Sequence, residues 1–317
     1  MDIGYTLSSE EHAPRDLVGY ATRAEEAGFD FLSISDHYHP WVDRQGHSPF
    51  VWTVIGGVAE ATERIPLMTG VSAPIIRYHP AIVAHAAATA GAMMPGRFML
   101  GLGTGENLNE HVTGQRWPSA DERLEMLEEA VGAIRTLWKG GTRSHRGRFF
   151  HVEDARIYDL PDPMPPILIA AKGDRATKLA GRIGDGLVAL APDEEMIQTF
   201  ESAGGEGKPR YGQIHVCWGE DEAAARRTAR EWWPNAGVQG ELTVELPMPR
   251  HFEQASENVT EDQVAEAIPP GPDPQPIIER VAKFRDAGYD HVYLHQVGPE
   301  QDGFLRFARE ELLPKLR

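Results

Sequence analysis

Ionisable and aromatic side chains crowd together in the segment SDHYHPW, residues 35–41, directly after a short apolar run. Asp36 and His37 stand where that run ends, and Trp41 adds an apolar wall beside them. Histidine exchanges protons near neutral pH, and a neighbouring carboxylate such as that of Asp36 can orient or charge its ring. An isolated Asp-His pair more often belongs to an ordinary loop. The hypothesis of acid–base chemistry at His37 therefore depends on similar residues following other strands.

A second candidate group lies in the glycine-rich segment GLGTGEN, residues 101–107. The segment does not fit a dinucleotide-binding GxGxxG motif, because Glu106 stands where the third glycine is required and no helix is expected to begin at once. We interpret its glycines as positions where the main chain approaches a flat ligand closely. Glu106 is a candidate general acid among them, and a loop carboxylate in water is an equal alternative.

The segment AAKGD, residues 170–174, changes directly from an apolar run to a helical pattern. Main-chain amides in the first turn of a helix have no partner within the helix and bind phosphate well. Ala171, Lys172 and Gly173 therefore form a candidate phosphate-binding turn, although every helix that follows a strand has such amides.

A metal site is the second enzymatic hypothesis. His37 and His39, spaced as HxH at a strand end, are able to hold a metal as in barrel hydrolases, with Asp36 and His295 as further ligands. No Asp or Lys obviously completes such a shell at the middle strands, so metal-dependent hydrolysis is the less favoured of the two enzymatic hypotheses. A binding protein without catalysis is favoured least.

The elements that must position these residues alternate regularly between strand and helix. Apolar runs predict strands at 2–7, 29–34, 65–71, 97–102, 166–171, 185–190, 211–217 and 289–296. Helical spacing predicts helices at 14–27, 49–61, 80–93, 119–138, 173–183, 193–203, 220–232, 261–268, 274–287 and 300–315. This pattern predicts an α/β protein with a TIM (β/α)8 barrel and loop insertions, and an open doubly wound sheet is the alternative.

The carboxyl ends of barrel strands share one face, so residues distant in the sequence are expected to converge there. We expect one domain over residues 1–317, because no linker or internal repeat divides the chain. Insertions are expected near 103–118, 141–158 and 233–260, and the last of these is interpreted as a cap over a pocket.

Composition excludes several classes of protein. The formal net charge of −17 argues against a broad nucleic-acid-binding or anionic-membrane surface. Cys217 is the single cysteine, which rules out an internal disulfide and fits a reducing compartment. The first residues lack the pattern of a secretory signal, and no apolar run is long enough to span a membrane. We therefore expect a cytoplasmic protein.

Several motifs together resemble those of the bacterial luciferase-like superfamily. They are SDHYHPW, RYHPAIVAHAAAT, MMPGRFMLGLGTGENLNEH, AGRIGDG and YLHQVGPEQDGFLRF, and they extend through nearly the whole chain. The chain is most similar to the branch of coenzyme F420-dependent enzymes related to glucose-6-phosphate dehydrogenase. This resemblance implies a TIM barrel, usually dimeric, that holds the deazaflavin in its strand-end cleft. It also implies hydride transfer between a hydroxyl-bearing small-molecule substrate (alcohol, sugar or sugar phosphate) and that cofactor.

The resemblance assigns roles to individual positions. His37 matches the proposed general base, Trp41 the active-site tryptophan, and Glu106 the proton donor or second acid–base group. The positions that match cofactor contacts are Asp36, Gly70, Val71, Thr104, Gly105, Asn109, Ala171, Lys172 and Gly173, the last three forming the cofactor-phosphate turn. A cis peptide between Gly70 and Val71 is common in the family. No metal is implied, and flavin mononucleotide (FMN) is the alternative cofactor.

The chain departs from this branch at the sugar phosphate. The family holds that group with two lysines and an arginine, whereas the corresponding positions here are Pro192 or Asp193, Thr243 and Ala267, none of them cationic. Arg250 and His251, within the 233–260 insertion, are the candidates to replace them. We therefore expect the substrate to be neutral or weakly charged rather than glucose-6-phosphate.

Overall fold

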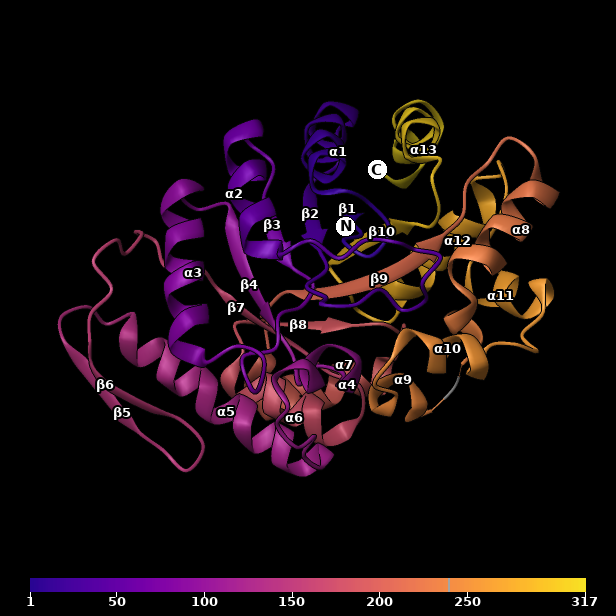
Figure 1. Ribbon diagram of the computed structural model, residues 1–317. Helices are drawn as coiled ribbons and strands as arrows, with labels where there is room; N and C mark the ends of the chain where they lie inside the picture. The colour runs from indigo at the N-terminus through magenta and orange to yellow at the C-terminus, as the bar shows by residue number, and fades with distance from the viewer. Residues whose placement is uncertain (239) are drawn as a thin grey trace.

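The eight predicted strands close into a parallel barrel in the computed structural model, which describes residues 1–238 and 240–317 (Figure 1). The open doubly wound sheet is excluded, because the first strand pairs with the last. The barrel strands are β1 (Asp2–Leu7), β2 (Phe31–Ile34), β3 (Leu67–Thr69), β4 (Phe98–Leu102), β7 (Ile167–Ala170), β8 (Gly186–Ala189), β9 (Arg210–Val216) and β10 (His291–Gln296).

Alternation along each strand separates an inner from an outer set of apolar side chains. The lower part of the barrel interior is filled by a cluster that includes Phe31, Met68, Leu168, Tyr211 and Tyr293. The opposite faces of the strands pack under the surrounding helices in the main core. Residues that follow the inner set at even spacing therefore point toward the barrel axis, nearer to its carboxyl-terminal mouth.

Helices cover the barrel, and most begin and end where the sequence predicts. Gly28 has a φ of 91° and ends α1 in the left-handed conformation, as expected of a glycine cap. The predicted start of the second helix at Pro49 is wrong, because α2 begins two residues later, at Val51. The helices are α1 (Pro14–Ala27), α2 (Val51–Ala61), α3 (Pro80–Met93), α4 (Asn107–Glu110), α5 (Ala120–Leu137), α6 (Asp174–Ile183), α7 (Glu194–Phe200), α8 (Glu222–Trp232), α9 (Leu242–Glu245), α10 (Pro249–Ala255), α11 (Glu261–Ala267), α12 (Gln275–Asp286), α13 (Gln301–Phe307) and α14 (Leu313–Leu316).

The three predicted insertions have different structures. Segment 141–158 forms the antiparallel hairpin of β5 (Arg143–Arg146) and β6 (His151–Ala155), which extends outward beyond α3 and α5 in Figure 1. Segment 103–118 contains α4, which begins at Asn107, so the expectation that no helix follows the glycines at once is wrong. Segment 233–260 contains α9 and α10, although Gln239 within it lies outside the described residues.

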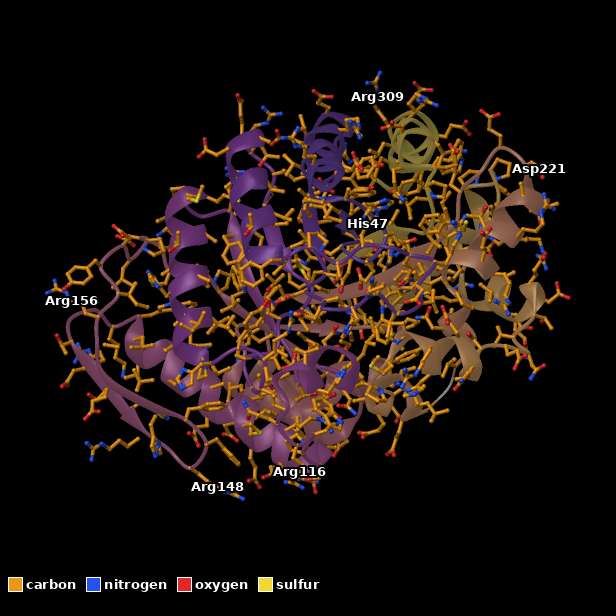
Figure 2. The ribbon with its side chains drawn as sticks, in the orientation of Figure 1. His47, Arg116, Arg148, Arg156, Asp221 and Arg309 are labelled. Atoms are coloured by element: carbon orange, nitrogen blue, oxygen red, sulfur yellow. The ribbon has the colours of Figure 1, made fainter. Side chains whose placement is uncertain are left out.

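Charged side chains lie at the periphery, as Figure 2 shows for Arg116, Arg148, Arg156, Asp221 and Arg309. Among the described residues, no helix combines the length and apolarity needed to cross a membrane.

Candidate active site at the mouth of the barrel

His37 lies in the loop after β2, and its ring is held on both sides. Nδ1 is 3.1 Å from the main-chain oxygen of His39, which only accepts hydrogen bonds, so Nδ1 carries a proton. Nε2 is 3.3 Å from Oε1 of Glu10, a buried carboxyl in the loop after β1. Burial by itself raises the pKa of Glu10, but His37 and the hydroxyl of Ser35 outweigh it and hold that pKa below its usual value. Glu10 therefore stays ionised and faces Nε2 of the His37 ring.

Asp36 does not contact His37, contrary to the expectation that it orients the ring. Its carboxylate accepts hydrogen bonds from the Ser72 hydroxyl at 2.5 Å, the Arg77 guanidinium at 2.9 Å and the Tyr78 hydroxyl at 3.2 Å. Asp36 therefore fixes the main chain of the His37 loop from below, and Glu10 is the carboxylate that faces the imidazole.

Arg77 joins Asp36 to a second buried carboxyl, Glu110. The Arg77 guanidinium lies 3.4 Å from Glu110 Oε1, and the Arg77 main-chain N–H donates to Oε2 at 2.7 Å. We call Asp36, Ser72, Arg77, Tyr78 and Glu110 the Arg77 cluster. It ties together the loops that follow β2, β3 and β4, because Asp36, Arg77 and Glu110 each come from a different loop.

Glu110 has the perturbed acidity that is typical of functional sites. Burial raises its pKa to about 7, Arg77 opposes this increase, and Glu106 nearby adds to it. The Glu110 side chain also supports Gly105, where an added Cβ would lie 3.0 Å from Glu110 Cγ. The buried carboxyl is thus packed directly behind the loop that carries Glu106.

Glu106 is half-buried and is tied to the His37 loop through Asn109. The Asn109 side chain donates to Glu106 Oε2 at 3.3 Å, and its oxygen accepts the main-chain N–H groups of Tyr38 at 2.9 Å and His39 at 3.3 Å. One buried amide therefore fixes the loop of Glu106 against the loop of His37, which brings the two predicted acid–base residues to the same mouth.

Glycines form a side-chain-free wall on β3 and β4. An added Cβ on Gly101 would lie 1.9 Å from the Thr69 main-chain oxygen, and one on Gly103 would lie 2.8 Å from Val71 Cγ2. An added Cβ on Gly70 would lie 2.1 Å from the Ser33 hydroxyl. We call Gly70, Gly101 and Gly103 the glycine wall. At these three positions the absence of a Cβ allows protein segments to approach each other closely.

The peptide between Gly70 and Val71 is cis, as the resemblance implies. Thr104 and Gly105, both half-buried, continue the wall from the end of β4 toward α4.

The predicted phosphate turn lies at the start of α6. Ala171 is buried and donates its N–H to the Val188 main-chain oxygen at 3.0 Å, whereas Lys172 and Gly173 are exposed. Gly173 has a φ of 98°, with open space where a Cβ would stand. The first amides of α6 are therefore accessible at the same end of the barrel as His37.

Segment 233–260 supports Trp41 and reaches the loops at the mouth. The Trp41 ring lies 5.0 Å from the His37 ring and 5.1 Å from the Phe252 ring of α10. The Asn107 side chain donates to the main-chain oxygen of Glu245, in α9, at 2.9 Å. Segment 233–260 therefore packs against Trp41 and against the segment that begins after Glu106.

The positions that match the family's phosphate cations carry no cation. Asp193 and Ala267 are exposed and Thr243 is half-buried. Arg250, the expected replacement, is exposed on α10 and lies beside His251.

Arg280 is a cation beside one of these positions, and the sequence analysis did not single it out. It donates to the main-chain oxygens of Ala267 at 2.7 Å and Glu266 at 2.5 Å. This guanidinium is thus committed to the carboxyl end of α11, where carbonyl groups lack helical partners.

The histidines of the metal hypothesis do not converge. His39 turns Nδ1 to the main-chain oxygen of Leu108 at 2.9 Å, and His295 Nε2 lies 2.7 Å from Glu11. Among residues 1–238 and 240–317, no group of three or more possible His, Cys, Asp or Glu ligands has the geometry to hold a metal ion.

Three further residues of the site were not predicted. Glu10 had a readable signal, because the acidic pair in SSEEH follows the first predicted strand. Arg77 and Glu110 had no signal in the sequence beyond being charged residues, since only the fold brings them together.

Replacement of Glu110 tests the buried carboxyl. A pKa raised from 4.5 to about 7 means that the folded protein binds more protons than the unfolded chain between those values, so this group's stabilisation is lost as pH rises through them. Glu110→Gln should therefore gain stability relative to the natural protein from pH 4.5 to pH 7.5, by about 3 kcal/mol at most. Urea unfolding at several pH values measures the difference, and the exposed Glu125→Gln is the control. A flat or opposite trend would contradict the assignment.

Known proteins resemble this chain over its full length. It is 36% identical to the F420-dependent glucose-6-phosphate dehydrogenase of Microbacterium testaceum, covering 99% of this chain and 97% of the relative. The enzyme of the same description from Kribbella flavida is 37% identical, covering 99% and 98% of the two chains.

A solved structure described as an F420-dependent secondary alcohol dehydrogenase, in complex with an F420-acetone adduct, superimposes with a TM-score of 0.92 at 29% identity. The match covers 100% of this chain and 99% of that one. The family model for luciferase-like monooxygenases matches residues 1–291. With the barrel and its mouth, these findings show that the chain belongs to the luciferase-like monooxygenase family, in its F420-dependent branch.

Proposed function

We propose that this protein is an F420-dependent oxidoreductase that transfers hydride between a hydroxyl-bearing small molecule and the deazaflavin. The observation that carries the proposal is the placement of His37, backed by Glu10, in the same mouth as Glu106 and next to the glycine wall. Relatives at 36% identity and a structural neighbour at 29% identity are F420-dependent dehydrogenases, which supports the same reaction class.

The site fits a flat cofactor with a phosphate. The glycine wall has no side chains and has to remain so, because an added Cβ at Gly101 or Gly103 would collide with the protein itself. The accessible amides at Lys172 and Gly173 are suited to a phosphate group. When bound there, the deazaflavin supplies a hydride acceptor, and the protein supplies orientation and charge.

His37 is proposed as the base that takes the proton of the substrate hydroxyl. Its Nδ1 is committed to the His39 carbonyl, so Nε2 is the ring atom that receives the proton. The Glu10 carboxylate lies 3.3 Å from that same nitrogen and stabilises the imidazolium that forms. Ser35, which donates to Glu10 at 2.5 Å, holds that carboxylate in place.

Glu106 is proposed as the second acid–base group, and Trp41 as the wall that confines the substrate near His37. Asn109 holds Glu106 in register with the His37 loop. The buried Glu110 behind it keeps negative charge close to Glu106, because its pKa of about 7 leaves it partly ionised at neutral pH.

The proposed substrate is neutral or weakly charged. A phosphomonoester requires charge-assisted partners, preferably a forked arginine. None of Asp193, Thr243 and Ala267 supplies one, and Arg280 donates to main-chain oxygens instead. The net charge of −17 also disfavours the approach of anions.

We also propose a homodimer through the outer faces of α2 and α3, which lie side by side (Figure 1). Both helices are poor in charge, and a helix that is apolar all round is normally buried. The exposed residues of α3 include Ile82, His85, Thr89 and Met93, none of them an Asp, Glu, Lys or Arg. In an acidic protein, such a face is where two copies approach without strong repulsion.

The cofactor is tested by titrating the apoprotein with coenzyme F420 and with FMN. F420 should bind at least tenfold more tightly, because the glycine wall and the α6 turn match the F420-dependent relatives. Isothermal titration calorimetry measures both affinities. Tight binding of FMN without a response to F420 would instead support an FMN-dependent oxidoreductase.

The acid–base roles are tested by His37→Ala, Glu10→Gln and Glu106→Gln. General acid–base catalysis typically contributes about 10²–10⁴-fold in rate, so each of His37→Ala and Glu106→Gln should lower kcat by that order. F420 affinity should stay within several-fold. Glu10→Gln should lower kcat less, because it removes the charge that stabilises the imidazolium but keeps the base. Single-turnover reduction of F420 measures the rates, with His145→Ala on the distant β5–β6 hairpin as control. A near-normal rate for His37→Ala would require another base.

The dimer is tested by Ile82→Asp, which adds a charge to the exposed face of α3. The variant should sediment as a monomer at concentrations where the natural protein is a dimer. Tyr158→Asp, at another exposed apolar residue beside the hairpin, is the matched control and should leave the dimer intact. A natural protein that sediments as a monomer would refute this proposal.

A further inference from the structure

A continuous belt of polar side chains lines half of the barrel interior, on β2, β1, β10 and β9. Thr6 pairs in register with Ser33, and His295 pairs with His215. Tyr5 pairs with Leu294, which places Thr6 and His295 side by side across the remaining seam. All four belong to the inner face, since Phe31, Tyr211 and Tyr293 of the inner cluster lie at even spacing from Ser33, His215 and His295. We call Ser33, Thr6, His295 and His215 the polar belt.

The polar belt has spare hydrogen-bonding capacity. The buried hydroxyls of Thr6 and Ser33 have no hydrogen-bond partner within the part of the chain that the structure describes. His215 lies beside His295, whose Nε2 is held by Glu11 at 2.7 Å. Buried polar groups nearly always have a partner, so the Thr6 and Ser33 hydroxyls call for a ligand or water.

His215 is the member of the belt that a ligand can reach. It is half-buried, and because the barrel is closed its accessible part opens only at the mouth. Its ring lies 4.8 Å from His295 and 5.4 Å from Trp233, which packs in one apolar cluster with Trp41. Trp41 in turn lies against His37. A molecule at His37 is therefore bounded by the same aromatic wall that leads to His215.

The order of the strands separates two functions around His37. The polar belt occupies β9, β10, β1 and β2, and the glycine wall occupies the next strands, β3 and β4. His37 follows β2, the boundary strand. With the cofactor on the glycine wall, the polar belt is the side left for the substrate.

We propose that His215 binds a second oxygen of an uncharged polyhydroxylated substrate, whose reacting hydroxyl lies at His37. This subsite rests on the proposed function and adds its substrate class: a diol, polyol or free sugar rather than a simple alcohol or a phosphate ester. A neutral imidazole both donates and accepts, which suits a hydroxyl group.

The charges near the belt favour an uncharged ligand. Burial, followed by the nearby His295 and Arg280, lowers the pKa of His215 well below its usual value, so its ring is neutral. Glu10 and Glu11 are both buried at the same end of the barrel and disfavour an anion. Arg280, whose charge acts on His215, is bound to main-chain oxygens.

The experiment compares the natural protein with His215→Phe and His215→Gln, using D-glucose, glucose-6-phosphate and 2-propanol as probes. In His215→Phe the ratio of kcat/KM for glucose to that for 2-propanol should fall about tenfold, the effect of one lost hydrogen bond. His215→Gln, which keeps donor and acceptor, should retain the ratio within about threefold. Unchanged F420 affinity shows that each variant is folded.

A binding measurement keeps this test separate from that of the proposed reaction. Calorimetry of glucose with the complex of enzyme and reduced F420 reports the subsite without turnover, and His215→Phe should weaken it about tenfold. An enzyme that binds glucose in this way but oxidises neither glucose nor 2-propanol would refute the proposed reaction. The proposed subsite would still stand. Equal losses for all probes, no loss in His215→Phe, or a loss in His215→Gln as large as in His215→Phe would overturn the subsite. Tighter binding of glucose-6-phosphate than of glucose, abolished by Arg280→Met, would overturn the uncharged class.

Discussion

The architecture of the site depends on one buried ionic interaction, the contact of the Arg77 guanidinium with Asp36 and Glu110. A buried charge is costly unless it is paired, and here one cation meets two carboxyls at 2.9 and 3.4 Å. With both carboxyls ionised the cluster has an excess negative charge. Burial raises the pKa of Glu110 to about 7, so a proton on Glu110 removes this excess near neutral pH. The cluster is thus close to a balance between two protonation states.

The cluster matters for function because each of its charges belongs to a different loop. Asp36 precedes His37 directly, and Glu110 lies four residues after Glu106. Movement of either loop would leave Arg77 with only one of its two carboxyl partners. The loops of the two proposed acid–base residues are therefore held together by these buried charges. Asn109 adds a second, uncharged tie between the same loops.

Much of the fold was predictable from the sequence, because eight apolar runs alternate with helical patterns and each run became a barrel strand. The short helices α4, α9 and α10 were not, since four to seven residues carry too little periodicity to be recognised. The start of α2 was predicted two residues too early, at Pro49, because proline suits the positions just before a helix as well as its first turn.

The site was predictable where residue type coincided with a strand end, as at His37 and Glu106. The side chains that contact these residues were harder to predict. Asp36 is adjacent to His37 in sequence but points the other way, while Glu10, 27 residues earlier, faces the ring at 3.3 Å. Neighbouring residues at a strand end point to opposite sides, so sequence proximity is a poor guide to pairing there. The order of strands in the barrel, which places β1 beside β2 and β10, is what brings in Glu10 and His295.

The same strand order sets a condition on how the chain is made. β1 lies beside β10, with Asp2 opposite His291, and the Glu11–His295 contact spans the same seam. A ribosome synthesises β1 first and β10 last, so the nascent chain carries an open sheet with unpaired edges at β1 and β9 until nearly all of it has emerged. Such edges are prone to aggregation. A product that stops short of residue 291 is consequently not a smaller working enzyme but an unclosed sheet for chaperones and proteases to handle. His295 of the polar belt is among the last residues to take its place.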